Sequence, residues 1–428
     1  MSQRNGAGNG VFALLDVPAT VQPSMAEDAR VQYRPIFASF LVRFCVAVTL
    51  CVLLLAIGEL AAYWRHLPDS GATLEPTLRR GLTNVSNTER EYWKQFEAAD
   101  AVTYHPYVLW RRTPFQGSMI NINADGVRQT THSACNDRNP TIWMFGDSTM
   151  WGAGAADDQT IASFLAADFQ NAGQPVCIVN YGEKAWANTQ EVVELIEQLK
   201  HTSHKPNLVV FYDGGTEAFT AYQTHQADMP SNYQGFKNYL EAWSAEQKPG
   251  FSYLEKTNTH RLLSGLSSKL AFRPKNPPRT ISDDQVASLA SAVVHNYQQN
   301  MEIIRMLGQQ YGFRPLFVWY PTLVVTHKPL TGSEQKAKVK EEERFPGISR
   351  IYQAVYATSQ EIQSPDFRYL GGVFDDEKKE VFVGISHIRP DSNRTIADRL
   401  FEIVEQAPLV NPAKKSEVAR RKGHRRPA

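Results

Sequence analysis

The sequence predicts an α/β protein, a three-layer α/β/α sandwich around a mainly parallel, doubly wound sheet. Four short, almost continuously apolar runs are typical of strands buried on both faces of such a sheet. They read TIWMF, PVCIVNY, NLVVFYD and PLFVWYP. Between them, apolar residues recur at helical spacing, as at Val192, Leu195, Ile196 and Leu199. This alternation indicates a parallel sheet with helices on both faces.

The expected elements follow one another from Thr141. A first helix face is marked by Ile161, Phe164, Leu165 and Phe169. After the third strand, an aromatic-rich insertion over 219–280 interrupts the alternation, and it is either ordinary core or the wall of a sugar-binding cleft. Its aromatic residues include Phe219, Tyr222, Tyr233, Phe236, Tyr239 and Trp243. The remaining elements are a helix over about 283–311, the fourth strand, a charged helix over 331–345, a helix over about 347–362 and a final helix.

The 428-residue chain is long enough for one large domain with appendages. We expect a disordered tail, a transmembrane helix, a connector with a hairpin at SMININ and Asp125-Gly126, the α/β domain, and a basic disordered tail. Their ranges are 1–35, 36–64, 65–140, 141–406 and 407–428.

The apolar run over 36–58 carries the membrane prediction. It is long enough to cross a bilayer as a helix, although a buried core helix is the alternative. Arg43 can reach the near interface, and Tyr63 and Trp64 suit the far one. The flanking arginines give little orientation. A short polar N-terminal tail favours a cytoplasmic N-terminus and a main domain outside the cytoplasm, in the periplasm.

Charge and cysteine content narrow the function classes. The net charge of +1 argues against a nucleic-acid-binding protein. Cys135 and Cys177 flank two apolar runs that would be neighbouring strands. They are either a disulfide, which needs an oxidising compartment, or two unpaired thiols. No group of His, Cys, Asp and Glu has metal-ligand spacing, so we expect no metal and no cofactor.

The segment TIWMFGDSTMWGAG places Ser148 just after the first strand. Ligands of doubly wound sheets bind beyond the carboxyl ends of the strands, so a substrate could reach this hydroxyl. Gly146 and Gly152 leave room around it, and a helix starting near Asp157 could point its positive end at the site. A serine nucleophile also needs a base, and His387, in the loop before the final helix, is the candidate. The alternative is that Ser148 only caps a helix and His387 only contacts backbone.

Four segments resemble the conserved blocks of the SGNH (GDSL-type) hydrolase superfamily, in the order and spacing of its membrane-anchored bacterial members. They are FGDSTMWGAG, NYGEKAW, FYDGGTEA and SHIRPDSNRTIADRL. The resemblance covers about residues 105–406. It implies an SGNH/flavodoxin-like fold with Ser148 as nucleophile, His387 as base and the backbone N–H groups of Ser148 and Gly182 facing the oxyanion. In the fourth block, Pro390 and Asn393 match the family's turn into the final helix.

Two positions depart from the family pattern. The third block normally offers an asparagine to the oxyanion, and Thr216 stands there; the fourth normally has an aspartate three residues before the histidine, where this chain has Gly384. Thr216 is a structural replacement or an oxyanion donor. A backbone carbonyl or a carboxylate could orient His387 instead, and the candidate carboxylates are Asp375, Asp376, Glu377 and Glu217. Asp147 and Asp213 are expected to hold loops rather than react.

These features favour ester chemistry, hydrolysis or acyl transfer, through an acyl-enzyme at Ser148. The resemblance implies an acylated cell-surface polysaccharide or another envelope glycan as substrate. The expected partners are therefore the lipid bilayer, an acylated glycan or small ester, and a membrane-protein partner, with no nucleic acid. The alternative is a catalytically weak or inactive domain that serves as a binding or assembly partner in an envelope complex.

Overall fold

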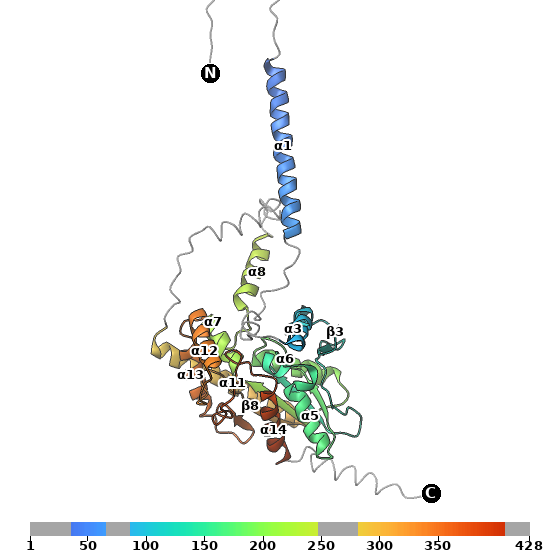
Figure 1. The fold of residues 1–428 in the computed structure, drawn as a ribbon, viewed down its shortest axis with the longest axis vertical. Helices are drawn as coiled ribbons and strands as arrows, with labels where there is room; N and C mark the ends of the chain where they lie inside the picture. The colour runs from blue at the N-terminus through green and yellow to red at the C-terminus, as the bar shows by residue number, and fades with distance from the viewer. Residues whose placement is uncertain (1–35, 66–85, 247–280, 407–428) are drawn as a thin grey trace, which may run out of the picture. The chain divides into compact units, whose positions relative to one another are not determined.

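The computed structural model describes residues 36–65, 86–246 and 281–406 (Figure 1). The chain forms two compact units, the first comprising 1–67 and 256–263 and the second 68–255 and 264–428. In the first unit the described residues form one helix, α1 (Ile36–Arg65). Among the described helices, none combines the length and apolarity that a bilayer crossing requires, so the transmembrane helix predicted over 36–64 gains no support. The predicted tails over 1–35 and 407–428 lie outside the described residues.

The second unit is built on a five-stranded parallel sheet, which confirms the predicted α/β class. The four predicted runs form β5 (Thr141–Gly146), β6 (Cys177–Asn180), β7 (Leu208–Asp213) and β8 (Arg314–Trp319). The strand order is β6-β5-β7-β8-β9, and all neighbours are parallel. The sheet therefore winds outward in both directions from β5 and β7, as a doubly wound sheet does.

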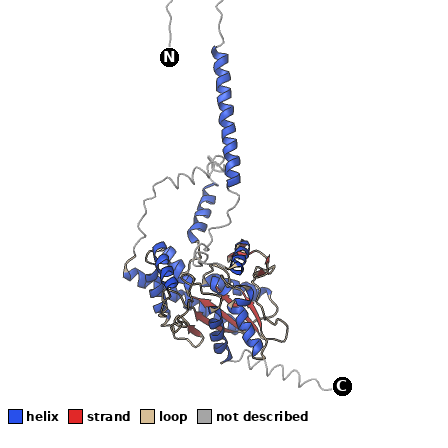
Figure 2. Ribbon diagram, viewed as in Figure 1, coloured by secondary structure: helices blue, strands red, loops and turns tan. Residues whose placement is uncertain are grey.

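Helices cover both faces of this sheet (Figure 2). One apolar cluster joins the sheet to α6 (Asn188–His201), α7 (Gly215–Thr224), α11 (Asp283–Tyr311) and α13 (Ile348–Ser359). A second cluster joins the opposite face to α5 (Ile161–Asn171) and α14 (Ser392–Glu405). Side chains alternate along β5, so that Trp143 and Phe145 belong to the first cluster while Ile142 and Met144 belong to the second. This is the predicted three-layer sandwich.

The predicted helices of the sheet domain are confirmed. The long helix α11 has the predicted bounds, and the predicted charged helix is α12 (Gly332–Arg344). Within the insertion, the structure describes α8 (Tyr233–Glu246). The short edge strand β9 (Phe367–Tyr369) was not predicted, because three residues are too few to show a periodic pattern.

The segment before the sheet contains α3 (Asn87–Ala98) and two antiparallel pairs. The pairs are β1 (Val102–His105) with β2 (Leu109–Arg112), and β3 (Phe115–Gln116) with β4 (Asn121–Ile122). Gly126 has a left-handed φ of +75° in the predicted turn, and an antiparallel bridge joins Ile122 to Arg128 across it. The hairpin predicted at SMININ and Asp125-Gly126 is therefore present, closed by this single bridge. The β1–β2 hairpin was not predicted, because β1 lies mostly exposed and its sequence shows no alternation.

Cys135 and Cys177 form a disulfide, which decides between the two alternatives left by the sequence. Cys177 is the first residue of β6, and its register partner in β5 is Thr141. The disulfide thus lies at the edge of the sheet where β5 and β6 begin. Cys45 and Cys51 in α1 are free.

Candidate active site

Ser148 lies at the carboxyl end of β5, where the chain turns directly into a helix. Gly146 has a φ of +153°, and a Cβ there would lie 2.7 Å from the Tyr212 carbonyl oxygen, so this position requires glycine. Asp147 caps the short helix α4 (Ser148–Trp151) by accepting from the Thr149 N–H. Ser148 is therefore the first residue of a helix, held between a tight turn and a capped end.

The helix next to the nucleophile is not the predicted one. The sequence suggested a helix starting near Asp157, but there the chain forms a single 3-10 turn (Asp157–Gln159). Helix α5 begins only at Ile161, after the Thr160 cap. The Asp157 carboxylate accepts a hydrogen bond from Arg128, which explains why this acidic residue is buried rather than exposed at a helix start.

The structure brings Ser148 and His387 together across 239 residues of sequence. The Ser148 Oγ lies 2.8 Å from the His387 Nε2. His387 belongs to the loop between β9 and α14, which is held by an antiparallel bridge between Phe382 and Ile388. The Asn393 side chain donates to the Gln159 carbonyl at 2.9 Å and ties the start of α14 to the loop after α4. The spatial contact on which a serine–histidine pair depends is present.

Both side chains are recessed, with Ser148 7% and His387 8% exposed. Burial lowers the pKa of His387 from 6.5 to about 4, against the opposing charge of Asp147 and with a smaller contribution from Lys184. The imidazole is therefore neutral at neutral pH, which is the form that can accept a proton from Ser148.

No described residue hydrogen-bonds to the other ring nitrogen, Nδ1. The Asp375 carboxylate accepts from the His327 N–H, and the Glu217 carboxylate accepts from the N–H groups of Gly214 and Asn188. The Glu377 carboxylate accepts from the Lys379 N–H, and Asp376 makes no hydrogen bond to the ring. None of the four candidate carboxylates therefore hydrogen-bonds to the ring, and three of them, Asp375, Glu217 and Glu377, hold loops or helix ends instead.

The Asp147 carboxylate organises the floor of the site, as the sequence suggested. It accepts from the Thr149 N–H at 2.8 Å and from the Thr149 hydroxyl at 2.7 Å. It also accepts from the Thr216 hydroxyl at 2.6 Å and from the Tyr320 hydroxyl. Because a threonine hydroxyl has one proton, Thr216 directs its donor to Asp147 in this arrangement. Its placement fits the structural replacement better than the oxyanion donor.

Gly182 lies against the backbone of α4. A Cβ there would lie 2.6 Å from the Trp151 backbone nitrogen, so only glycine permits this approach. The Gly182 N–H donates to the Asn180 side-chain oxygen at 3.0 Å, and the Asn180 amide nitrogen donates to the Met150 carbonyl at 2.9 Å. The Ser148 N–H, by contrast, donates to no described acceptor. Of the predicted oxyanion donors, Ser148 keeps its N–H unengaged.

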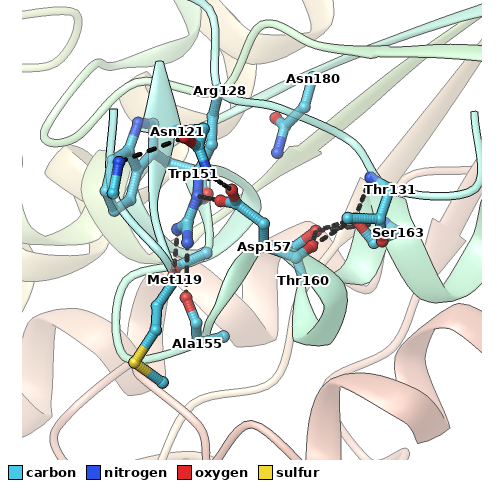
Figure 3. Close-up of polar contacts among 12 residues, drawn as sticks. Met119, Asn121, Arg128, Thr131, Trp151, Ala155, Asp157, Thr160, Ser163 and Asn180 are labelled. Atoms are coloured by element: carbon cyan, nitrogen blue, oxygen red, sulfur yellow. Dashed lines mark hydrogen bonds and ion pairs between the residues drawn. The ribbon is translucent and has the colours of Figure 1, made fainter. Parts of the chain in front are cut away.

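Arg128 is a fully buried cation beneath the nucleophile loop, and sequence reasoning missed it (Figure 3). It donates to the carbonyl oxygens of Trp151, Gly152 and Ala155 at 3.0, 2.7 and 2.6 Å. Its Nε lies 3.0 Å from Asp157, and its guanidinium lies over the Trp151 ring, 4.2 Å from the centroid. Arg128 thereby fixes the chain that leaves α4. A single arginine after a hairpin gives no sequence signal for this role.

A second set of buried charges ties the N-terminal segment to the second block. Arg112 contacts Glu183 through two hydrogen bonds of 3.0 Å, one from its backbone N–H and one from Nε. Lys184 pairs with Asp100, and its ammonium lies 4.1 Å from the Phe96 ring centroid. The segment over 86–128 is thus packed against the loops that surround Ser148, and the site depends on it.

Comparisons with known proteins gave no match by sequence and weak matches by structure. No model of a known protein family matches the chain, and no curated protein matches it by sequence. Among solved structures, the lipase Lip_vut3 from a goat rumen metagenome aligns at a TM-score of 0.34 and 13% identity, over 62% of this chain and 97% of that one. A G-D-S-L family lipolytic protein from Veillonella parvula aligns at 0.34 and 12%, over 62% and 99%. The acetyl xylan esterase AlAXEase aligns at 0.32 and 11%, over 62% and 99%. TM-scores of this size do not establish a shared fold, so the interpretation rests on the strand order, the motifs and the site.

Proposed function

We propose that the protein is a serine esterase or O-acyltransferase of the SGNH type. The observation that carries the proposal is the 2.8 Å contact between the Ser148 hydroxyl and the His387 imidazole at the carboxyl edge of the sheet. The Ser148 N–H, unengaged at the start of α4, supports the same chemistry, because it can donate to the oxyanion of a tetrahedral intermediate.

The reaction follows from this geometry. Ser148 Oγ attacks the carbonyl carbon of an ester while its proton passes to His387 Nε2. The intermediate collapses when Nε2 returns that proton to the leaving alkoxide, and the acyl group remains on Oγ. A water molecule or an acceptor hydroxyl then attacks the acyl-enzyme and gives its proton to His387. The bond between the acyl carbon and Oγ breaks, and His387 returns this proton to Ser148 Oγ, which releases the acid or the new ester and restores the serine. Hydrolysis and transfer share every step but the last.

For the substrate we propose an acylated envelope glycan, with the domain acting outside the cytoplasm. The Cys135–Cys177 disulfide supports an oxidising compartment. Tyr104, Tyr107 and Tyr239 are 74%, 75% and 71% exposed. Exposed aromatic rings offer faces on which sugar rings stack. Trp110 of β2 stacks on Phe236 of α8 at 5.9 Å, so the hairpin and the insertion helix meet near these tyrosines.

The test is labelling with a fluorophosphonate probe, followed by mass spectrometry of the labelled peptide. The wild type should be labelled at Ser148, and Ser148→Ala should not be labelled. Ser163→Ala is a matched control, because Ser163 is a buried serine whose hydroxyl donates to the Asp157 carbonyl. A folded wild type that does not react, or reacts elsewhere, contradicts the proposal.

The second candidate function is a binding or assembly partner with little catalysis. Gly384 favours it, because the histidine lacks the carboxylate that normally fixes its tautomer and orientation. The variant Ser148→Ala distinguishes the two candidate functions. If the protein is an esterase, the variant loses ester turnover; if it is an assembly partner, the variant keeps its complexes and its function.

A further inference from the structure

His387 is buried, yet one of its two nitrogens has no partner in the described protein. Nε2 contacts Ser148, whereas Nδ1 contacts no described donor or acceptor. For Nε2 to accept the serine proton, the ring must carry its own proton on Nδ1. That N–H needs an acceptor, and without one the opposite tautomer, which cannot act as base, competes.

The space in front of Nδ1 is the space that an aspartate at position 384 would fill. A Cβ built on Gly384 would meet one atom within 4 Å, His387 Nδ1 itself at 4.0 Å. Gly384 has no left-handed φ, so its backbone would accept other residues. Although Nδ1 has no described hydrogen-bond partner, it is not completely sealed from solvent. The position of Gly384 therefore leaves an opening beside the ring nitrogen, where a carboxylate on residue 384 would stand, and we infer that a small acceptor can occupy it.

Two charged groups, Lys184 and Asp147, act on the ring in opposite directions. Lys184 is close enough to His387 to act on its titration. Asp147 opposes it and has the larger effect on the ring, although four hydrogen bonds from Thr149, Thr216 and Tyr320 spread the Asp147 charge. In the reaction the imidazole becomes an imidazolium, which adds a positive charge facing the same opening.

We propose that the substrate supplies the missing carboxylate: the protein acts on acyl esters of acidic glycans, and a uronate carboxylate of the bound chain accepts the Nδ1–H of His387. This inference rests on the proposed function and names its substrate class. The carboxylate holds the tautomer in which Nε2 is the base and stabilises the imidazolium, and it leaves the site with the product. Neutral esters leave Nδ1 without this partner and react slowly.

The experiment compares an O-acetylated oligouronate with the same oligomer after methyl esterification of its carboxyl groups. Acetate release then reports the same ester in the presence and absence of the charge. In a serine protease, loss of the orienting carboxylate costs about 10⁴ in kcat, so a preference of at least about tenfold in kcat/KM for the acidic oligomer is expected. Added formate should raise the rate on the methyl-esterified oligomer, and chloride at equal ionic strength should not.

Variants at position 384 supply the controls. Gly384→Asp places a fixed carboxylate beside Nδ1, so it should turn over the methyl-esterified oligomer faster than the wild type does. It should also lose the preference for the acidic oligomer, and added formate should not change its rate. Gly384→Leu fills the same space without an acceptor and should give no gain on the methyl-esterified oligomer, whereas Gly384→Asn offers an uncharged acceptor and should give a smaller gain than Gly384→Asp.

The possible results distinguish a failure of the acidic-glycan proposal from a failure of the esterase proposal on which it rests. If Ser148 is labelled and acetate is released, but the two oligomers react equally, the substrate inference is overturned and the esterase stands. If formate rescues the neutral oligomer while the acidic one has no advantage, a free anion is the partner and the inference is again overturned. If neither the wild type nor Gly384→Asp reacts with the probe, both proposals fall.

Discussion

Thr216 stands where the SGNH pattern that the third block resembles has an asparagine, and its hydroxyl donates to Asp147. Thr216→Val removes this hydrogen bond with little change in shape. We expect the free energy of unfolding to fall by about 1 kcal/mol. We expect kcat to change less than about threefold, whereas losing an oxyanion donor costs roughly 10²–10³.

The measurements for this variant are urea unfolding and acetate release. Thr220→Val is the matched control, because Thr220 is another threonine on α7, buried, whose hydroxyl donates to the Glu217 carbonyl. A hundredfold loss of kcat confined to Thr216→Val would instead make Thr216 part of the oxyanion site.

The lowered pKa of His387 predicts how the reaction at Ser148 depends on pH. Because burial lowers this pKa from 6.5 to about 4, the ring stays neutral and active from neutral pH down to about pH 5. The rate of fluorophosphonate labelling should then fall as the pH drops through about 4. Gly384→Asp should move this acid limb to higher pH, because a carboxylate beside Nδ1 stabilises the imidazolium. An acid limb near 6.5 in the wild type would contradict the burial argument.

The same shift has a consequence for stability, and its sign is fixed by linkage. The unfolded state binds a proton at the ordinary pKa of 6.5, and the folded state does so only near 4. Between these values the unfolded state binds more protons, so this residue makes the protein less stable as the pH falls from 6.5 to 4. His387→Gln should lack this part of the pH dependence.

At the scale of elements, Arg128 joins the hairpin segment to the residues that follow α4. Arg128→Met should lower the free energy of unfolding by about 3–5 kcal/mol, because it leaves Asp157 buried without its cation. Adding Asp157→Asn removes the uncompensated charge, so the double variant should be less destabilised than the two single effects added together. Urea unfolding of the four proteins measures this coupling; additive effects would mean that the pair does not act as a unit.

Some helices and strands could be predicted from the sequence and others could not, depending on whether a local pattern of apolar or capping residues marks them. The strands β5, β6, β7 and β8 were predictable, because each is apolar over almost its whole length. The long helix α11 was predictable to its ends, because Ser282 and Gln285 form a capping box and Gly312 closes it in a left-handed conformation. The β1–β2 hairpin was not, because its position depends on contacts such as Arg112 with Glu183, 71 residues away.

The residues of the candidate site also fall into those that the sequence predicts and those that it does not. Ser148 and His387 could be named because each lies within a recognisable block, and the doubly wound order brings both to one edge of the sheet. Arg128, Asn180 and Tyr320 could not, because their roles consist of hydrogen bonds to backbone or to Asp147 that no local pattern records. The candidate carboxylates near position 375 could not be tested from the sequence for the same reason: their charge could be read from it, but their distance to the ring could not.

At the scale of the whole molecule, the disulfide and the nucleophile lie at opposite ends of β5. Cys177 pairs in register with Thr141 at the start of the strand, whereas Ser148 follows its last residue, Gly146. We expect the disulfide at the start of β5 to stabilise the fold without affecting the reaction of Ser148 at the other end of the strand. Stability and catalysis should therefore respond separately when the disulfide is removed.

The variant Cys135→Ala/Cys177→Ala tests this separation. The bond closes a loop of sequence separation 42. Restricting the unfolded chain over such a loop stabilises the fold by about 2–4 kcal/mol, so the variant should unfold at a lower urea concentration. Below its unfolding transition, its rate of labelling at Ser148 should match that of the wild type. The pair Cys45→Ala/Cys51→Ala removes the two free cysteines and should change neither quantity. Slower labelling in a fully folded disulfide variant would mean that the start of β5 influences the geometry at its end.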